Sequence, residues 1–266
     1  MPTSQSNQPR RTLLLTGASR GIGHATVKRF SAAGWRVITC SRHPFPENCP
    51  WEAGPEDHIQ VDLADEANTV AAVEEIKNRL ESNELHALVN NAAISPKTAG
   101  GARMGTLDTA IEVWHQVFQV NFFGPIMLAR GLVDQLKAAK GSVVNVTSIA
   151  GSRVHPFAGA AYATSKAALA SLTREMAFDF GRLGIRVNAI APGWIRSELS
   201  DNYINAQADP DAAWEGLYRM HPVGRVGEPA DVGRLAVYLA GDDAAFMTGQ
   251  VIVIDGGRTS KLPLPF

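Results

Sequence analysis

Hydrophobic residues along this chain fall into short runs that are separated by longer amphipathic stretches. The runs are rich in Val, Ile and Leu and predict buried strands, whereas the longer stretches carry apolar residues at helical spacing. We expect seven strands, at residues 12–16, 36–40, 58–61, 87–90, 142–147, 186–190 and 250–254. We expect helices at residues 22–33, 66–80, 111–138, 161–180 and 229–239.

Strands and helices that alternate in this way build a parallel sheet through right-handed crossovers. The predicted fold class is therefore α/β: a Rossmann-type doubly wound parallel sheet of about seven strands with helices on both faces. Residues 11–266 fit a single domain, and residues 1–10 fit a flexible N-terminal tail. The carboxyl ends of parallel strands share one edge of the sheet, and ligands of such sheets bind there.

Three segments interrupt the alternating pattern. Residues 41–57 and 95–106 are rich in Pro, Gly or acidic residues and predict loops at the ligand edge. Residues 198–227 form a weakly helical, irregular region that fits a lid over a substrate site. The tail at residues 262–266 is apolar, and it fits either a cover for a subunit interface or a loose end.

Composition narrows the class of partner. The net charge of -1 gives no long-range attraction to nucleic acid or to an anionic membrane, so we expect neither as a partner. No apolar run is long enough for a signal peptide or a membrane span, which makes the cytoplasm the expected location. Cys40 and Cys49 lack the spacing of a redox or zinc pair and are expected to be free thiols.

A glycine-rich turn follows the first expected strand and begins the first helix. It reads Thr-Gly-Ala-Ser-Arg-Gly-Ile-Gly at residues 16–23. Glycines let the backbone approach a pyrophosphate closely, and a helix N-terminus presents free N–H groups and a positive dipole end to it. The candidate cofactor-binding residues of this turn are Gly17, Ser19, Arg20, Gly21, Ile22 and Gly23.

The glycine spacing of this turn, G-x-x-x-G-x-G, resembles the cofactor motif of the short-chain dehydrogenases/reductases. The resemblance extends from about residue 11 to residue 257 and includes several motifs in the family's order. It implies a dinucleotide-binding catalytic domain that moves a hydride between a nicotinamide cofactor and a carbonyl or alcohol.

The end of the second strand indicates which nicotinamide cofactor is used. An acidic residue there would bind a ribose 2′-hydroxyl, but the chain has Ser41 and Arg42 instead. A guanidinium suits a 2′-phosphate, and Arg20 in the glycine turn can approach the same group. The sequence therefore predicts NADP(H).

Two further turns match the family's cofactor contacts. By resemblance, Asp62 touches the adenine amino group and Leu63 contributes backbone contacts. Asn91 and Ala92 belong to an N-N-A-A segment that resembles the family's N-N-A-G. Ala93 replaces the final glycine, which predicts an ordinary negative φ at this position.

Tyr162 and Lys166 are four residues apart, so a helix places both side chains on one face. An ammonium close to a phenol lowers the phenol's pKa and makes it a better acid and base near neutral pH. Lys166 is also expected to bind the nicotinamide ribose, and both residues are expected to contact the cofactor. This pair resembles the family's catalytic Tyr and Lys.

Ser148 ends the fifth strand and is expected to polarise the substrate oxygen. Thr147 competes for this role, but strand alternation directs it to the other face. By resemblance, the backbone carbonyl of Asn121 holds a water that connects Lys166 to solvent. A helix-kinking role without chemistry is the alternative for Asn121.

The segment after the sixth strand resembles the family's nicotinamide-binding turn through Pro192, Gly193, Ile195 and Ser197. The backbone of Ile195 would bind the carboxamide, and the hydroxyl of Ser197 would bond the cofactor. His155, Trp194 and His221 are candidate substrate contacts, with packing as the alternative. No cluster of carboxylates and histidines suggests a metal site.

The resemblance is greatest to 3-oxoacyl-[acyl-carrier-protein] reductase-like members, through residues 224–229 and 248–257. Sugar, polyol and steroid dehydrogenases share these segments and remain alternatives. A protein that binds NADP without turnover is an alternative of another class, although such proteins often lose the Tyr or the Lys. The resemblance also implies a small-molecule substrate and a homotetramer or homodimer that pairs through residues 111–138 and 161–180.

Overall fold

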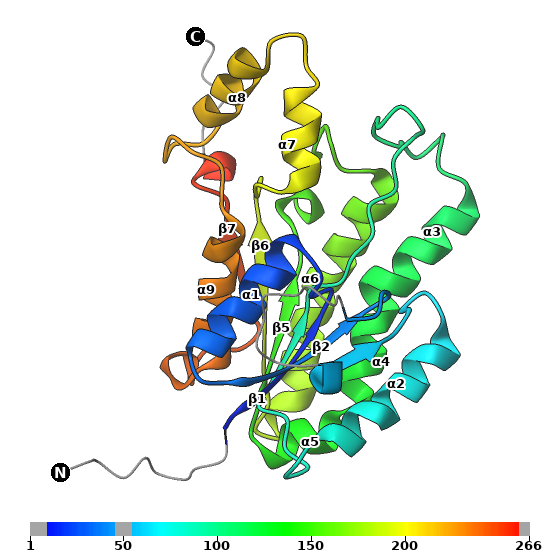
Figure 1. Cartoon of the computed structure of the whole chain (residues 1–266), viewed down its shortest axis with the longest axis vertical. Helices are drawn as coiled ribbons and strands as arrows, with labels where there is room; N and C mark the ends of the chain where they lie inside the picture. The colour runs from blue at the N-terminus through cyan, green and yellow to red at the C-terminus, as the bar shows by residue number, and fades with distance from the viewer. Residues whose placement is uncertain (1–9, 46–54, 261–266) are drawn as a thin grey trace, which may run out of the picture.

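The chain folds into one twisted parallel sheet that is covered by helices on both faces, as the computed structural model shows (Figure 1). The structure describes residues 10–45 and 55–260. The strand order is β3-β2-β1-β4-β5-β6-β7, so the chain reverses direction across the sheet between β3 and β4. The strands are β1 (Thr12–Thr16), β2 (Arg36–Ser41), β3 (His58–Gln60), β4 (Ala87–Asn90), β5 (Ser142–Val146), β6 (Arg186–Pro192) and β7 (Val251–Ile254). The predicted fold class is confirmed.

The helices form two layers. α1 and α9 pack together on one face of the sheet, while α2, α4 and α6 cover the other face (Figure 1). The helices are α1 (Gly21–Ala32), α2 (Glu66–Arg79), α3 (Ile111–Phe118), α4 (Gly124–Gly131), α5 (Val133–Ala138), α6 (Ala160–Gly181), α7 (Glu198–Asn205), α8 (Pro210–Arg219) and α9 (Pro229–Ala240). Most bounds differ from the predicted ones by one or two residues.

The alternation of side chains along each strand divides the core into two apolar clusters. On β1, Leu14 contributes to the cluster under α2 and α4, while Leu13 and Leu15 contribute to the cluster under α1 and α9. All three are fully buried. A strand that is apolar at every position therefore has both faces covered, as expected in a doubly wound sheet.

The single helix predicted for residues 111–138 is wrong. The structure has α3, a π-helical turn at Gln119–Phe123, then α4 and α5 with a break at Leu132. Pro125 lacks the N–H that would bond to the carbonyl of Asn121 in a regular α-helix. The amide of Gly124 bonds instead to the carbonyl of Gln119, five residues back.

The region expected to form a lid is helical and lies at the carboxyl edge of the sheet. α7 and α8 project beyond β6 and β7 at this end of the molecule (Figure 1). Ser197 caps α7 through a hydrogen bond from the amide of Ser200, and Asp209 caps α8 through one from Ala212. These caps explain why a weak apolar pattern still forms two defined helices.

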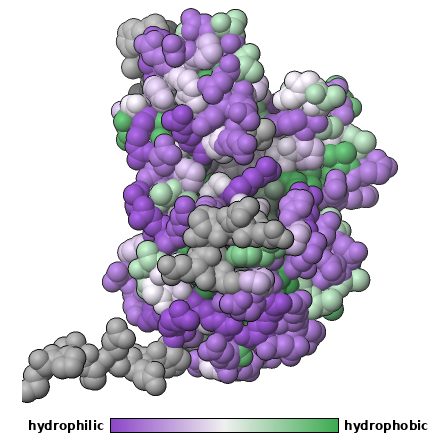
Figure 2. All heavy atoms as spheres, viewed as in Figure 1, coloured by the Kyte–Doolittle hydropathy of each residue, from purple (hydrophilic) through white to green (hydrophobic). Residues whose placement is uncertain are grey.

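Other expectations concern the surface and the thiols. The face seen in Figure 2 is largely hydrophilic, with apolar residues gathered on the right over α3. No helix among the described residues is long and apolar enough to cross a membrane. Cys40 is a buried free thiol on β2, while Cys49 and the tail at residues 262–266 lie outside the described residues.

Candidate active site

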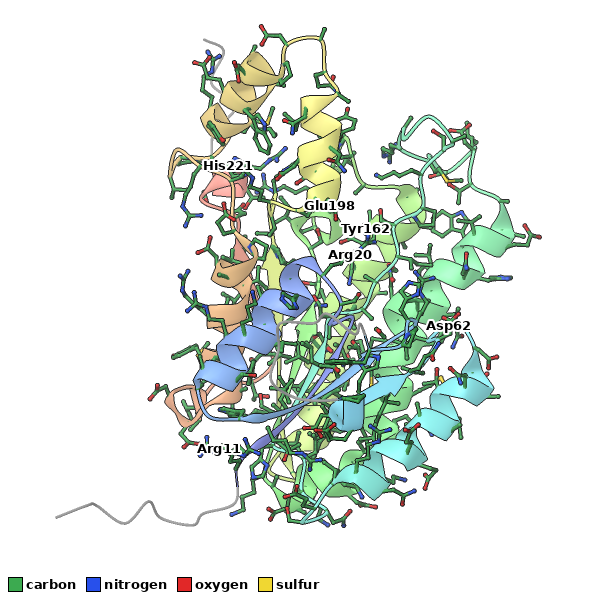
Figure 3. The ribbon with its side chains drawn as sticks, viewed as in Figure 1. Arg11, Arg20, Asp62, Tyr162, Glu198 and His221 are labelled. Carbon is green, nitrogen blue, oxygen red and sulfur yellow. The ribbon has the colours of Figure 1, made fainter. Side chains whose placement is uncertain are left out.

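A groove of about 520 Å³ lies along the carboxyl edge of β1, β2, β3 and β4. Its volume is in the range of cofactor and ligand sites in proteins. In Figure 3, Arg20 at the start of α1 and Asp62 after β3 mark two sides of this groove. Most cofactor-binding residues predicted from the sequence line it: Gly17, Ser19, Arg20, Ile22, Gly23, Ser41, Arg42, Asp62, Leu63, Asn91, Ala92, Ile195 and Ser197.

The glycine turn after β1 leaves no room for side chains. A Cβ atom on Gly23 would lie 2.0 Å from the carbonyl oxygen of Gly17, and one on Gly17 would lie 2.8 Å from Cα of Ala92. Arg20 provides no side-chain cap for α1, and the first turn of α1 contains no acidic residue. The first N–H groups of α1 are therefore suited to a bound phosphate. Gly21 has a φ of +56° but does not line the groove.

Asn91 ties the end of β4 to the glycine turn. Its Nδ2 donates to the carbonyls of Thr16, at 3.0 Å, and Gly17, at 2.9 Å. The Thr16 hydroxyl accepts from the amides of Asn91 and Ala92 at 3.1 and 3.0 Å. Asn91 thus shapes the glycine turn, and Ala93 keeps a negative φ as expected.

The end of β2 is held by a histidine that the sequence analysis did not single out. The Ser41 hydroxyl donates to the carbonyl of His43 at 2.9 Å. Nε2 of His58, on the neighbouring β3, is 2.9 Å from the same carbonyl, so this nitrogen carries the proton. Nδ1 of His58 lies 2.8 Å from the hydroxyl of Thr39. The register between β2 and β3 pairs His58 with Thr39, and no signal in the sequence gives that register.

Asp62 and Leu63 line the groove where the chain leaves β3. The Asp62 carboxylate accepts from the amide of Ala64 at 3.0 Å, and the Asp62 amide donates to the side chain of Asn68 at 2.7 Å. Asn68 lies in the first turn of α2, so the helix fixes the Asp62 turn.

Tyr162 and Ser148 meet at the carboxyl end of β5. Tyr162 lies in the first turn of α6, and its side chain is hydrogen-bonded to that of Ser148. Ser148 also accepts from the amide of Ala150 at 3.1 Å. Thr147 donates to the carbonyl of Ile190 at 2.8 Å, so its hydroxyl is engaged on the β6 side. The pairing of Ser148 rather than Thr147 with Tyr162 agrees with strand alternation.

The pKa of Tyr162 does not follow the expectation. Burial raises this pKa above its ordinary value, and the hydrogen bond with Ser148 opposes the rise. Nζ of Lys166 is 5.8 Å from the Tyr162 ring centre and donates to the carbonyl of Val146 at 2.6 Å. Lys166 is directed at this carbonyl, and burial lowers its own pKa to about 7. For both reasons the effect of burial on the pKa of Tyr162 is larger than that of the Lys166 charge.

The Asn121 side chain connects three segments of the site. Its Oδ1 accepts from the amide of Ile94 at 2.8 Å, and its Nδ2 donates to the Ile94 carbonyl and to the Ser165 hydroxyl at 3.0 and 3.1 Å. The π-helical turn orients Asn121 toward α6 and the β4 loop. The missing N–H of Pro125 removes the helical partner of the Asn121 carbonyl.

The turn after β6 differs partly from its expected role. The amide of Gly193 donates to the carbonyl of Ile254 at 2.9 Å, which binds this turn to β7. Pro192 and Gly193 do not line the groove, but Ile195 and Ser197 do. The Ser197 hydroxyl already caps α7, so it serves the helix as well as the groove.

The catalytic candidates do not line the groove of the cofactor residues. Ser148, Tyr162, Lys166 and Asn121 are absent from its walls, and Tyr162 borders a small separate cavity with Pro96 and Met104. Of the three candidate substrate contacts, His155 and Trp194 lie together, with ring centres 6.4 Å apart. His221 is buried and donates through Nδ1 to the carbonyl of Leu217 at 2.7 Å, which fits packing.

Comparison with known proteins gives matches along nearly the full length. The protein-family model described as Enoyl-(Acyl carrier protein) reductase matches residues 17–259. Protein FixR of Bradyrhizobium diazoefficiens is 56% identical over 93% of this chain and 86% of its own. Oxidoreductase UcpA of Salmonella typhimurium is 33% identical over 94% of each protein.

A solved structure is similar to the same extent. An oxidoreductase of the short chain dehydrogenase/reductase family from Brucella ovis, in complex with a partially ordered NAD, has a TM-score of 0.78. It is 57% identical, and the match covers 93% of this chain and 100% of that one. These matches include both the glycine turn and the helix of Tyr162, so they do not depend on one motif. The chain belongs to the short-chain dehydrogenase/reductase family.

Proposed function

We propose that this protein is an NADP(H)-dependent oxidoreductase that interconverts a carbonyl compound and a secondary alcohol, with Tyr162 as the proton donor or acceptor. The observation that carries the proposal is the contact of the Tyr162 and Ser148 side chains, with Lys166 one helical turn beyond Tyr162. Two hydroxyls that meet at the carboxyl edge of the sheet can both bond one substrate oxygen.

The groove fits a dinucleotide by its own chemistry. Its turn excludes any Cβ at Gly17 and Gly23, and a helix N-terminus without acidic residues faces it. Gly17, Ser19, Arg20, Ile22 and Gly23 would hold the pyrophosphate, with Gly21 in the bend between them, while Asp62, Leu63, Asn91 and Ala92 would hold the adenosine side. Ile195 and Ser197 would hold the nicotinamide side, and Pro192 and Gly193 would position this turn against β7. The bound nicotinamide supplies the hydride that the reduction requires.

In the direction of reduction, Ser148 donates a hydrogen bond to the substrate oxygen and Tyr162 transfers its proton to that oxygen. Burial raises the pKa of Tyr162, so the phenol holds this proton at neutral pH until charge develops on the substrate oxygen. In the direction of oxidation, Tyr162 first loses its proton toward Lys166 and solvent, and the ionised phenol then accepts the proton of the alcohol.

Lys166 and Asn121 resupply the proton in this proposal. Lys166 is 2% exposed, and a pKa of about 7 lets it exchange a proton near neutral pH. Its Nζ would also bind the nicotinamide ribose. The Asn121 carbonyl, whose regular helical partner is missing because Pro125 has no N–H, would hold a water that leads to solvent.

The NADP(H) preference is supported by the residues at the end of β2. Ser41, Arg42 and His43 line the groove there, and Arg20 lines it from the glycine turn. A 2′-phosphate at this position would meet guanidinium groups and no carboxylate from the end of β2. The related Brucella ovis protein was solved with NAD, so the preference of this chain needs its own measurement.

The proposal extends to the substrate, the location and the assembly. A 3-oxoacyl thioester is the substrate suggested by residues 224–229 and 248–257, with sugars, polyols and steroids as alternatives. We also propose a cytoplasmic location and a homotetramer or homodimer. Retention of both Tyr162 and Lys166 favours an enzyme over an NADP-binding sensor without turnover.

Replacement of Tyr162 by Phe tests the chemistry directly. Tyr162→Phe removes the proton that the substrate oxygen needs but keeps the ring, so turnover should fall by at least about a hundredfold. The measurement is NADPH oxidation with ketones, 3-oxoacyl thioesters, sugars and ketosteroids, and NADP⁺ reduction with the matching alcohols.

NADPH binding, measured by fluorescence titration, serves as the control and should change less than about threefold because the phenol is not needed to hold the phosphates. Turnover that survives in Tyr162→Phe would exclude this residue as the proton donor. NADPH binding by the wild-type protein without turnover of any compound would favour the sensor.

A further inference from the structure

Four aromatic rings lie together at the carboxyl edge, beside the ends of β5 and β6. Phe157 lies at the centre, with its ring centre 5.0 Å from Trp194, 5.6 Å from Tyr203 and 5.8 Å from His155. His155 and Phe157 lie in the loop before α6, Trp194 follows β6, and Tyr203 comes from α7. These segments lie next to Ser148 and Tyr162 along the chain, which makes the aromatic cluster the candidate wall of the substrate side.

Basic side chains surround the aromatic cluster. Nζ of Lys97 donates to the carbonyl of Phe157, and Nε of Arg103 donates to the carbonyl of Ala158 at 2.8 Å. Arg258 follows β7. The pKa of His155 is lowered to about 4 by burial and by the charges of Arg258 and Lys97. His155 is therefore neutral at pH 7, and the charged groups that act on its pKa are both cations.

The carboxylate beside Arg258 is engaged elsewhere. Asp255 favours the charge of Arg258, but its two oxygens accept from the amides of Gly257, at 2.9 Å, and Thr259, at 2.7 Å. Asp255 therefore offsets Arg258 only in part.

Two buried donors in this region have no hydrogen-bond partner among the described residues. They are Nε1 of Trp194 and Nη1 of Arg258. A third donor follows from the tautomer of His155: its Nδ1 accepts from the amide of Phe157 at 3.3 Å, so Nε2 carries the proton in the neutral ring. Buried donors without acceptors are costly, and their occurrence together indicates a missing acceptor.

We propose that the substrate carries a carboxylate in addition to its reacting carbonyl or alcohol, and that Arg258, Trp194 and His155 donate hydrogen bonds to it. Lys97 adds charge without direct contact, because its ammonium is bound to the Phe157 carbonyl. A planar guanidinium and an indole N–H match the geometry of a carboxylate. This inference rests on the proposed function and narrows its substrate to oxo acids or hydroxy acids.

Matched ketone pairs test the proposal. Each pair is an oxo acid and its methyl ester, such as acetoacetate and methyl acetoacetate or 4-oxopentanoate and methyl 4-oxopentanoate. The wild-type enzyme should prefer the acid by at least about tenfold in kcat/KM for the pair of fitting length. Arg258→Met should reduce that preference by at least about tenfold, mainly through the KM of the acid.

Two variants control for charge and for folding. Arg258→Lys keeps the charge and should retain part of the preference, which a purely structural role of Arg258 would not predict. Arg182→Met removes an exposed arginine just after α6, outside the proposed subunit interface, and should leave the preference unchanged.

A binding measurement separates this proposal from the proposed function. The ring resonances of His155, assigned by comparison with His155→Gln, report the pKa of His155 by NMR in the protein saturated with NADP⁺. The oxo acid should raise this pKa because an anion favours the imidazolium, and the methyl ester should not.

The outcomes are distinguishable. The carboxylate proposal would be overturned if esters and acids were turned over at equal rates, or if no acid changed the pKa of His155. Either result would leave the proposed oxidoreductase function standing. A response of His155 to an acid without turnover of any pair would support the carboxylate site and contradict the proposed function.

Discussion

At the scale of single residues, the site depends on small hydrogen-bonded units that fix groups in place. Thr16 and Asn91 hold the glycine turn, and His58 holds the turn that follows Ser41. The motif residues were predictable because the chemistry requires particular side chains. Thr39 and His58 were not, because their contact depends on the register between β2 and β3.

Ser41 provides a residue-scale prediction about the cofactor. Ser41→Asp places a carboxylate at the end of β2, where it would repel a 2′-phosphate and bind a ribose diol. The NADPH over NADH preference in kcat/KM should fall by at least about tenfold, with most of the change in the KM for NADPH. Steady-state kinetics with both cofactors measures it.

Ser41→Ala is the matched control, since it removes the hydroxyl without adding charge and should move the preference much less. An unchanged preference in Ser41→Asp would mean that the adenosine ribose does not lie at the end of β2.

At the scale of elements, the interrupted helix of residues 111–138 is the main difference between prediction and structure. Its hydrophobic period is continuous through α3 and α4, so the period alone predicts one helix. The π-helical turn arises because Pro125 lacks an N–H and the Gly124 amide bonds to Gln119. The turn orients Asn121 so that it bonds Ile94 and Ser165.

Pro125→Ala tests whether this interruption serves the reaction. Alanine restores an N–H that can bond the Asn121 carbonyl and would compete with the proposed water. We expect kcat to fall by roughly threefold or more, with a changed pH profile and an unchanged KM for NADPH.

Pro229→Ala, at the first position of α9, is the matched change at a helix start away from the site. It should leave kcat and its pH profile as in the wild type. A Pro125→Ala enzyme with wild-type kcat at every pH would remove the Asn121 carbonyl from the proton path.

At the scale of the molecule, several large apolar side chains remain exposed. Phe178 on α6 is 85% exposed, and Val253 on the edge strand β7 is 48% exposed. Apolar residues also gather over α3 in Figure 2, where Ile111 is 60% exposed. A second copy that packs on α3 and α6 would bury such side chains, each of which contributes about 2 kcal/mol when fully covered.

Light scattering after size exclusion tests this assembly. The wild-type protein should have the mass of a dimer or tetramer, and Phe178→Glu should shift it toward a smaller species because a buried carboxylate without a partner is costly. Val70→Glu alters an exposed apolar residue on α2, outside the proposed interface, and should keep the wild-type mass. A monomeric wild-type protein would contradict the proposal.

The sequence by itself determined the sheet, the order of its elements and the place of the glycine turn, and it singled out Ser148, Tyr162 and Lys166 as candidates. It could do so because periodicity, glycine spacing and helical spacing are local properties of the chain. Only the tertiary structure decided which neighbours these residues have. It directed Lys166 to the carbonyl of Val146, raised the pKa of Tyr162 by burial, and brought Arg258, which follows the last strand, close enough for its charge to lower the pKa of His155. Electrostatic environment and side-chain contact depend on residues that are far apart in sequence, and for that reason the substrate side could be described only after folding.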